Sequence, residues 1–128
     1  MNRAVLDASA IMAAIHREPG AEKADKIVES GAAVSAVNLA EVVRKFSAGG
    51  ALVADTRDIL GALGLEIVPF DTEQAYMAGA LEPQFDALGL SLGDRACLTL
   101  AKILHLPAVT TDRQWAKLRV GVDIVVLR

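Results

Sequence analysis

The stretch Ala4–Asp7 (AVLD), followed at once by Ser9–His16 (SAIMAAIH), decides the fold. The first stretch is apolar at nearly every position, which suits a strand buried on both faces, as in a parallel sheet. The second stretch is mainly apolar and long enough for a short helix. Together they predict a buried strand that passes directly into a helix.

The same alternation continues along the chain. Further apolar runs of strand length are Ala33–Ala36, Glu66–Pro69, Ala108–Thr111 and Asp123–Leu127. Helical stretches, most of them ended by glycine or proline, are Ala21–Ser30, Leu39–Ala48, Leu52–Leu63, Thr72–Ala87, Leu92–Leu106 and a short Arg113–Leu118. Three of the connections hold two helices each. Strands separated by helices imply right-handed crossovers, so we predict an α/β fold: a three-layer α/β/α sandwich around a five-stranded parallel sheet.

Composition is that of one ordinary domain, which we expect to span residues 1–128. Hydrophobic residues make up 53% of the chain but aromatic residues only 4%, so the core must be built from Ala, Val, Leu and Ile. No apolar run approaches the roughly 18 residues of a membrane span. The opening resembles a signal peptide, but Asp7 interrupts it and cleavage would remove the first strand. We therefore expect a cytoplasmic protein. The single Cys97 is expected to be a buried small hydrophobe.

Four acidic residues fall at related places on this scaffold. Asp7 ends the first strand, Glu41 lies in the first turn of the helix after the second strand, and Asp112 directly follows the fourth strand. In open α/β sheets, ligands bind beyond the carboxyl ends of the strands, and functional residues lie there. Asp94 precedes its strand, so its helix must lean over the same edge for this acid to join the others.

Each acid also has a structural interpretation. Asn38-x-x-Glu41 and Ser91-x-x-Asp94 match the capping-box pattern, and Asp7 and Asp112 can cap the helices that follow them. However, caps are needed at every helix, whereas these acids lie beside strands one, two and four. The grouping favours a shared site.

Four motifs containing these acids resemble those of a known family. VLDASAI, NLAEVVRKF, SLGDRACLTLA and VTTDRQW occur in this order and are similar to the acidic motifs of PIN domains, most of all those of VapC-type toxins from type II toxin–antitoxin pairs. The resemblance implies a sheet order of 3-2-1-4-5, which brings strands one, two and four together. It also implies magnesium- or manganese-dependent cleavage of RNA, often transfer RNA.

The same resemblance implies roles for the acids. Asp7 and Asp94 match the principal metal ligands, while Glu41 and Asp112 complete the catalytic cluster. Some relatives carry a further acid where this chain has Ala116. The net charge of −3 counts mildly against a broad basic surface for RNA, so cations must act locally. Candidate groups near the acids are Ser9 and Thr111 for hydrogen bonds, and Arg44, Lys45, Arg95 and Arg113 for phosphate contacts, against ordinary solvation or packing.

Partners also follow from the resemblance: an RNA substrate, a cognate antitoxin and a second copy in a homodimer. The apolar helices Ala21–Ser30 and Leu39–Leu63 predict either a groove for an amphipathic antitoxin segment or ordinary core packing. Two alternatives stay open within the family, a processing nuclease that is not a toxin and a catalytically inactive RNA-binding relative. A phosphate-signalling receiver domain is disfavoured because Asp7 lacks a paired acid, and a nucleotide-binding module because no glycine-rich phosphate loop is present.

Overall fold

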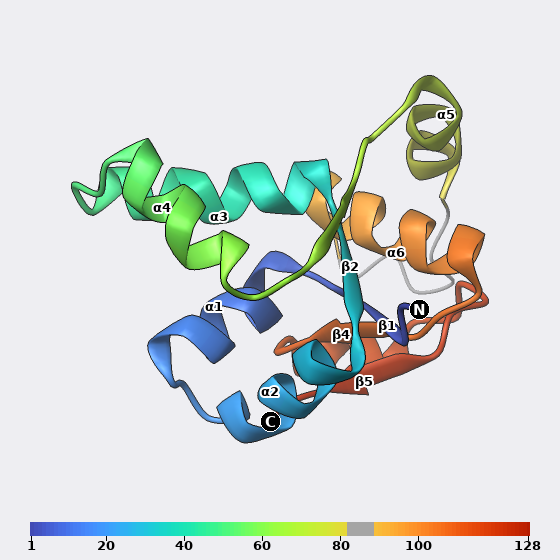
Figure 1. Ribbon diagram of the computed structural model, residues 1–128. Helices are drawn as coiled ribbons and strands as arrows, with labels where there is room; N and C mark the ends of the chain where they lie inside the picture. Colours follow the sequence, from blue (N-terminus) through green and yellow to red (C-terminus); the bar gives the residue numbers. More distant parts are fainter. Residues whose placement is uncertain (82–88) are drawn as a thin grey trace.

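The computed structural model describes residues 1–81 and 89–128 and has the predicted alternation of strands and helices (Figure 1). The strands are β1 (Ala4–Leu6), β2 (Ala32–Ser35), β3 (Glu66–Val68), β4 (Ala108–Thr110) and β5 (Ile124–Val126). The helices are α1 (Ala8–His16), α2 (Ala21–Ser30), α3 (Ala36–Ala48), α4 (Val53–Gly61), α5 (Thr72–Ala80), α6 (Leu92–Leu104) and the 3-10 helix η2 (Arg113–Lys117). Each predicted strand overlaps an observed one, and the three predicted double-helix connections are confirmed.

All five strands are parallel, in the order β3-β2-β1-β4-β5, which confirms both the fold class and the expected strand order. Strand β1 lies in the middle, with Val5 paired to Ala33 of β2 on one side and to Ala108 of β4 on the other. The carboxyl ends of β1, β2 and β4 therefore meet at one edge of the sheet.

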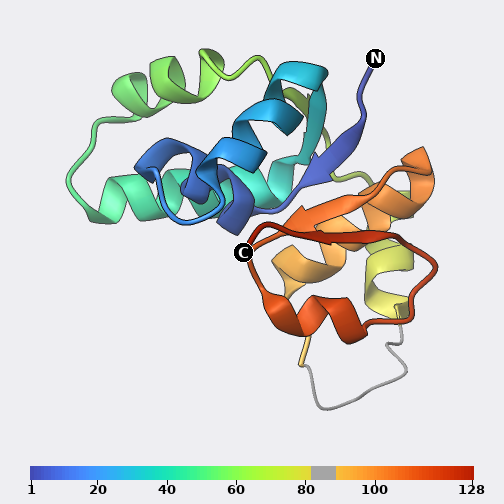
Figure 2. The same cartoon turned by 90° about the horizontal axis from the view of Figure 1, so that it is seen from below.

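Helices cover both faces of this sheet (Figure 2). Because side chains alternate along a strand, Leu6 and Val34 pack in the core cluster that contains residues of α1, α2, α3 and α4. Val5 and Ala33 pack in the second cluster, against α6 and η2. These are the two apolar interfaces of a three-layer sandwich, and they hold β1 rigidly between them.

Helix α3 begins earlier than predicted. It starts at Ala36 rather than Leu39, directly from the end of β2, and Ser35 is its N-cap, accepting a hydrogen bond from the backbone N–H of Val37 at 3.2 Å. The predicted capping box of Asn38 and Glu41 is therefore wrong, and so is the placement of Glu41 in the first turn. The strand runs into the helix without a loop, which moves both side chains inside the helix.

The helices are short. Helices α3 and α6 have 13 residues each, and no helix among residues 1–81 and 89–128 has the length and apolar character needed to cross a lipid bilayer. The predicted helix Thr72–Ala87 ends earlier, at Ala80, because Leu81 has extended backbone, and the remaining residues of that prediction, 82–87, lie outside the described residues.

Candidate functional site

Asp7 lies just past the end of β1 and is only 7% exposed. As the N-cap of α1, its Oδ1 accepts a hydrogen bond from the backbone N–H of Ala10 at 2.8 Å, so the predicted cap is confirmed. The hydroxyl of Ser9 donates to the same oxygen at 2.7 Å, as considered from the sequence. Capping thus occupies one carboxylate oxygen, Oδ1, and leaves the other, Oδ2, for contacts across the sheet.

Thr110 holds that second oxygen. Its hydroxyl donates to Oδ2 of Asp7 at 2.6 Å and accepts a hydrogen bond from the backbone N–H of Asp112 at 3.1 Å. Thr111, the threonine expected from the sequence to form hydrogen bonds here, donates only its backbone N–H, to the Ser9 hydroxyl at 3.0 Å. A hydroxyl at the end of the strand beside β1 was the signal that could have identified Thr110.

Asp112 is exposed and follows β4 as predicted. Its carboxylate caps η2 by accepting a hydrogen bond from the backbone N–H of Gln114 at 2.9 Å. The backbone of Asp112 is thus joined to Asp7 through Thr110, while its side chain lies outside the buried part of the cluster.

Asp94 lies in the first turn of α6 and is half-buried. It forms the predicted capping box with Ser91: the Ser91 hydroxyl accepts from the Asp94 N–H, and the Asp94 carboxylate accepts from the Ser91 N–H, each at 3.1 Å. As the sequence required, α6 packs on the sheet and directs its N-terminal end toward the edge where β1 ends, close enough for the charge of Asp94 to act on Asp7.

Glu41 is held against the same turn of α6. The side-chain amide of Asn38 donates to Oε1 of Glu41 at 2.8 Å and to the backbone carbonyl of Gly93 at 3.1 Å. A Cβ atom added at Gly93 would lie 2.6 Å from Cδ of Glu41, so only glycine leaves room for this carboxylate. Glu41 therefore lies beside the residue that precedes Asp94. Asn38 was predicted only as a cap, and its bridging role depends on contact between two helices.

The charges of three of the acids act on the same buried thiol. Burial raises the pKa of the Asp7 carboxyl above its usual range, the hydrogen bonds from Thr110, Ser9 and Ala10 lower it, and the charge of Asp94 raises it again. Burial also raises the pKa of the Cys97 thiol, and the negative charges of Asp7, Asp94 and Glu41 raise it further. Cys97 is fully buried, as predicted, beneath these three acids.

The donor set suits a hard divalent cation. Magnesium is usually bound by one or two carboxylates and keeps several water ligands. The negative charge of Asp94 raises the affinity of the Asp7 carboxylate for a positive charge. Among the residues that the structure describes, no group of three or more His, Cys, Asp or Glu side chains lies so that it could hold an ion. Asp7 and Asp94 are thus candidates for a two-carboxylate site completed by water, rather than members of a closed cage.

Two of the candidate cations are used within the protein. The guanidinium of Arg95 donates to the backbone carbonyls of Ala78 at 3.0 Å and Leu81 at 2.7 Å, which ties α6 to the end of α5. Nε of Arg113 donates to the backbone carbonyl of Arg128 at 3.0 Å. Trp115, in η2, is buried in the second core cluster.

A groove of about 230 Å³ lies between α3, α4 and β3. Helices α3 and α4, which were predicted either to form a groove or to pack in the core, line this groove and also contribute buried residues to the core. Val42 and Leu60 are buried, whereas Leu52 and Val53 are 69% and 57% exposed at the start of α4. The residues that line the groove are Leu39, Val43, Val53, Thr56, Arg57, Leu60, Gly61, Leu65 and Ile67.

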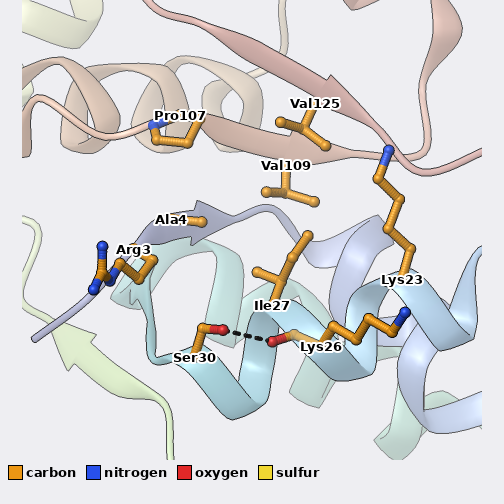
Figure 3. Close-up of a pocket in the computed structure, with 9 residues that line it drawn as sticks. All are labelled: Arg3, Ala4, Lys23, Lys26, Ile27, Ser30, Pro107, Val109 and Val125. Atoms are coloured by element: carbon orange, nitrogen blue, oxygen red, sulfur yellow. Dashed lines mark hydrogen bonds between the residues drawn. The ribbon is translucent and has the colours of Figure 1, made fainter.

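A second groove, of about 540 Å³, lies between α2 and the sheet (Figure 3). Its apolar wall includes Ile27, Val109 and Val125, and no carboxylate lines it. Arg3 and Pro107, which precede β1 and β4, place the groove toward the amino ends of the strands. It is therefore separate from the acids at the carboxyl ends.

The PIN-domain family model matches residues 4–121, and the chain therefore belongs to the PIN-domain family. The matched region contains Asp7, Glu41, Asp94 and Asp112. Comparison with curated proteins gives no match.

Solved structures of toxin–antitoxin proteins share the fold. A DNA-bound VapBC complex from Salmonella typhimurium is similar with a TM-score of 0.74 and 20% identity over 100% of both chains. A toxin–antitoxin complex from Klebsiella pneumoniae has a TM-score of 0.74 and 19% identity over 98% of both chains. VapC20 of Mycobacterium tuberculosis, a toxin that cleaves the sarcin–ricin loop, has a TM-score of 0.69 and 14% identity over 88% of this chain and 92% of its own.

Proposed function

We propose that this PIN-domain protein is a metal-dependent endoribonuclease that acts as the toxin of a toxin–antitoxin module. The observation that carries the proposal is the burial of Asp7 next to the charge of Asp94, because a carboxylate whose pKa is raised by burial and by a second acid is stabilised by a bound cation. The similarity to VapC20, a toxin that cleaves the sarcin–ricin loop, supports RNA as the substrate class.

Asp7 and Asp94 would hold the magnesium or manganese ion, with Glu41 and Asp112 completing the catalytic group. When bound, such an ion lowers the pKa of a coordinated water and offsets negative charge on a phosphodiester. The protein's own contribution is to hold the carboxylates still: Ser9 and Thr110 bind the two oxygens of Asp7, and the capping box binds Asp94. Fixed ligands need no rearrangement when the substrate arrives.

The proposal is tested by cleavage of total and transfer RNA by highly purified protein. Chelator should stop cleavage, magnesium or manganese should restore it, and zinc should not be required. Calcium should support little turnover because its longer, looser coordination positions water poorly. Asp7→Asn and Asp94→Asn, prepared in parallel, should each be inactive while folded. Cleavage that persists in excess chelator and in both variants would refute the mechanism.

We further propose that the groove between α3 and α4 accepts an apolar segment of a cognate antitoxin. Exposed Val53 at this groove and exposed Leu52 beside it support the idea, as do the antitoxin-containing complexes among the similar structures. Partly exposed apolar surface also fits a cytoplasmic homodimer, which light scattering would detect. Expression of the chain without its neighbouring gene should arrest growth, and Asp7→Asn should not. A harmless, folded wild type that still cuts RNA would favour the processing nuclease, and one that cuts none would favour an inactive relative.

A further inference from the structure

Asn38 is a buried amide that joins two helices next to the acids. It is the third residue of α3 and is 1% exposed. One N–H of its side chain is directed to the carboxylate of Glu41 and the other to the backbone carbonyl of Gly93, in the first turn of α6. Both donors of the amide are therefore used at the point where α3 meets α6.

The orientation of this amide is fixed by its neighbours. Both groups that it contacts are acceptors, so only the nitrogen end can face them. The Oδ1 oxygen then has no hydrogen-bond partner among the described residues, 1–81 and 89–128, although it is buried. A buried polar atom without a partner costs about 1–3 kcal/mol. An apolar residue of similar size would avoid that penalty but would also lose both donated hydrogen bonds, so what sets asparagine apart at this position is its contact with Glu41 and Gly93.

Glu41 depends on this contact. In the part of the chain that the structure describes, no other side chain donates a hydrogen bond to its carboxylate. The carboxylate also lies so close to Gly93 that a Cβ there would overlap it. The amide thus presses Glu41 against the first turn of α6, where the N-terminal end of the helix favours negative charge. Without the amide, an unbranched glutamate side chain has several other rotamers available.

We propose that Asn38 is a positioning residue for RNA cleavage, which fixes the carboxylate of Glu41 beside Asp94. The inference rests on the proposed nuclease function, because it assigns Asn38 a role through Glu41 in that reaction. This role would add Asn38 to the four acids as a residue that affects cleavage. It also explains the unpartnered oxygen, because the amide nitrogen must face Glu41 and Gly93 and the oxygen then points away from both.

The test compares Asn38→Leu with a matched control, Gln74→Leu. Gln74, in α5, is also a buried amide that donates to a backbone carbonyl, Pro69 O at 3.1 Å, and its oxygen has no partner in the part of the chain that the structure describes. Asn38→Leu should lower kcat for a defined RNA by about 10- to 100-fold with little change in KM, since displacement of a reacting group by about 1 Å can have effects of this size. Gln74→Leu should keep the wild-type kcat.

A second comparison establishes that Asn38 acts through Glu41. In a Glu41→Gln background, Asn38→Leu should lower kcat little further, because residues that act as one unit are not additive. A wild-type kcat in folded Asn38→Leu, or an equal loss of kcat with and without Glu41, would overturn the inference. If Asn38→Leu does not fold, Asn38→Ala decides, because it removes both donors without burying a new charge or a larger side chain, and it should lose a similar part of kcat.

A crystal structure of the leucine variant provides a readout that does not depend on activity. Glu41 should leave its place against Gly93, and a carboxylate that stays there would also contradict the inference. The nuclease function and the positioning role of Asn38 can be refuted separately. Wild-type protein that cuts no RNA with manganese refutes the nuclease, whereas active wild type with an equally active Asn38→Leu refutes only the positioning role.

Discussion

Thr110 and Asp7 are 103 positions apart in the sequence, yet the hydroxyl of Thr110 donates a 2.6 Å hydrogen bond to the Asp7 carboxylate. The contact exists because β4 pairs with β1 in parallel, so that the ends of the two strands lie side by side. The same hydroxyl accepts the backbone N–H of Asp112. One threonine thus connects two acids that belong to different strand ends.

Thr110→Val should destabilise the protein by about 1–3 kcal/mol, because it leaves an oxygen of the buried Asp7 and the N–H of Asp112 without this partner. RNA cleavage should fall as well. Thr99→Val is the matched control, since the buried Thr99 hydroxyl has no partner within residues 1–81 and 89–128 and its removal should be neutral or stabilising. Urea unfolding measures both variants. Equal effects of the two substitutions would show that the contact with Asp7 contributes nothing.

Asp7→Asn should raise the stability of the metal-free protein at neutral pH by a few degrees in Tm. Burial raises the pKa of Asp7 in the folded state, so the ionised carboxylate opposes folding, while asparagine caps a helix about as well as aspartate. Thermal melts in chelator provide the measurement. A clearly lower Tm for the asparagine variant would mean that Asp7 serves mainly as a charged cap.

The advantage of Asp7→Asn should depend on pH in a defined direction. Between the unfolded pKa of 3.8 and the higher folded pKa, the unfolded chain has released the Asp7 proton while the folded chain keeps it. The free energy of unfolding of the wild type therefore falls as pH rises through that window. The difference between variant and wild type should be smallest below pH 3.8 and level off above the folded pKa. Urea titrations across this range test it, and a difference that shrinks with rising pH would contradict it.

Gly93→Ala should displace Glu41 and lower cleavage by about 10-fold or more, because the new methyl group would occupy the space of the carboxylate. Gly79→Ala in α5 is the control, since no atom of the described residues lies within 4 Å of its added Cβ. It should stabilise the helix by about 0.5–1 kcal/mol and leave cleavage unchanged. The two variants are compared by RNA turnover and thermal melts. Full activity of Gly93→Ala would mean that the position of Glu41 does not matter.

Manganese should stabilise the wild-type protein without any RNA present. At about 100 times its dissociation constant, a ligand that binds only the folded state adds roughly 2.7 kcal/mol to the free energy of unfolding. Asp94→Asn removes a proposed ligand charge but can keep its cap with Ser91, so it should fold and lose most of the manganese-dependent shift in Tm. An unchanged shift in Asp94→Asn would place the ion elsewhere.

Much of the fold could be predicted because its signals are local. Runs such as Ala4–Leu6 are apolar throughout, and glycine or proline ends most of the predicted helices, so strand and helix positions follow from neighbouring residues. The caps at Asp7 and Asp94 were predictable for the same reason. The start of α3 was not, because Ser35 serves both as the last residue of β2 and as the helix cap.

The candidate site could likewise be predicted only where its signals are local. By itself the sequence determined which acids follow which strands, since Asp7 and Asp112 are adjacent in the chain to β1 and β4. The strand order needed the family resemblance as well. Only the tertiary structure decided that Thr110 rather than Thr111 reaches Asp7, and that Asn38 joins Glu41 to α6 across 55 positions. A hydrogen bond between distant segments depends on strand register and helix packing to within an ångström, and neither is encoded in the residues next to the donor.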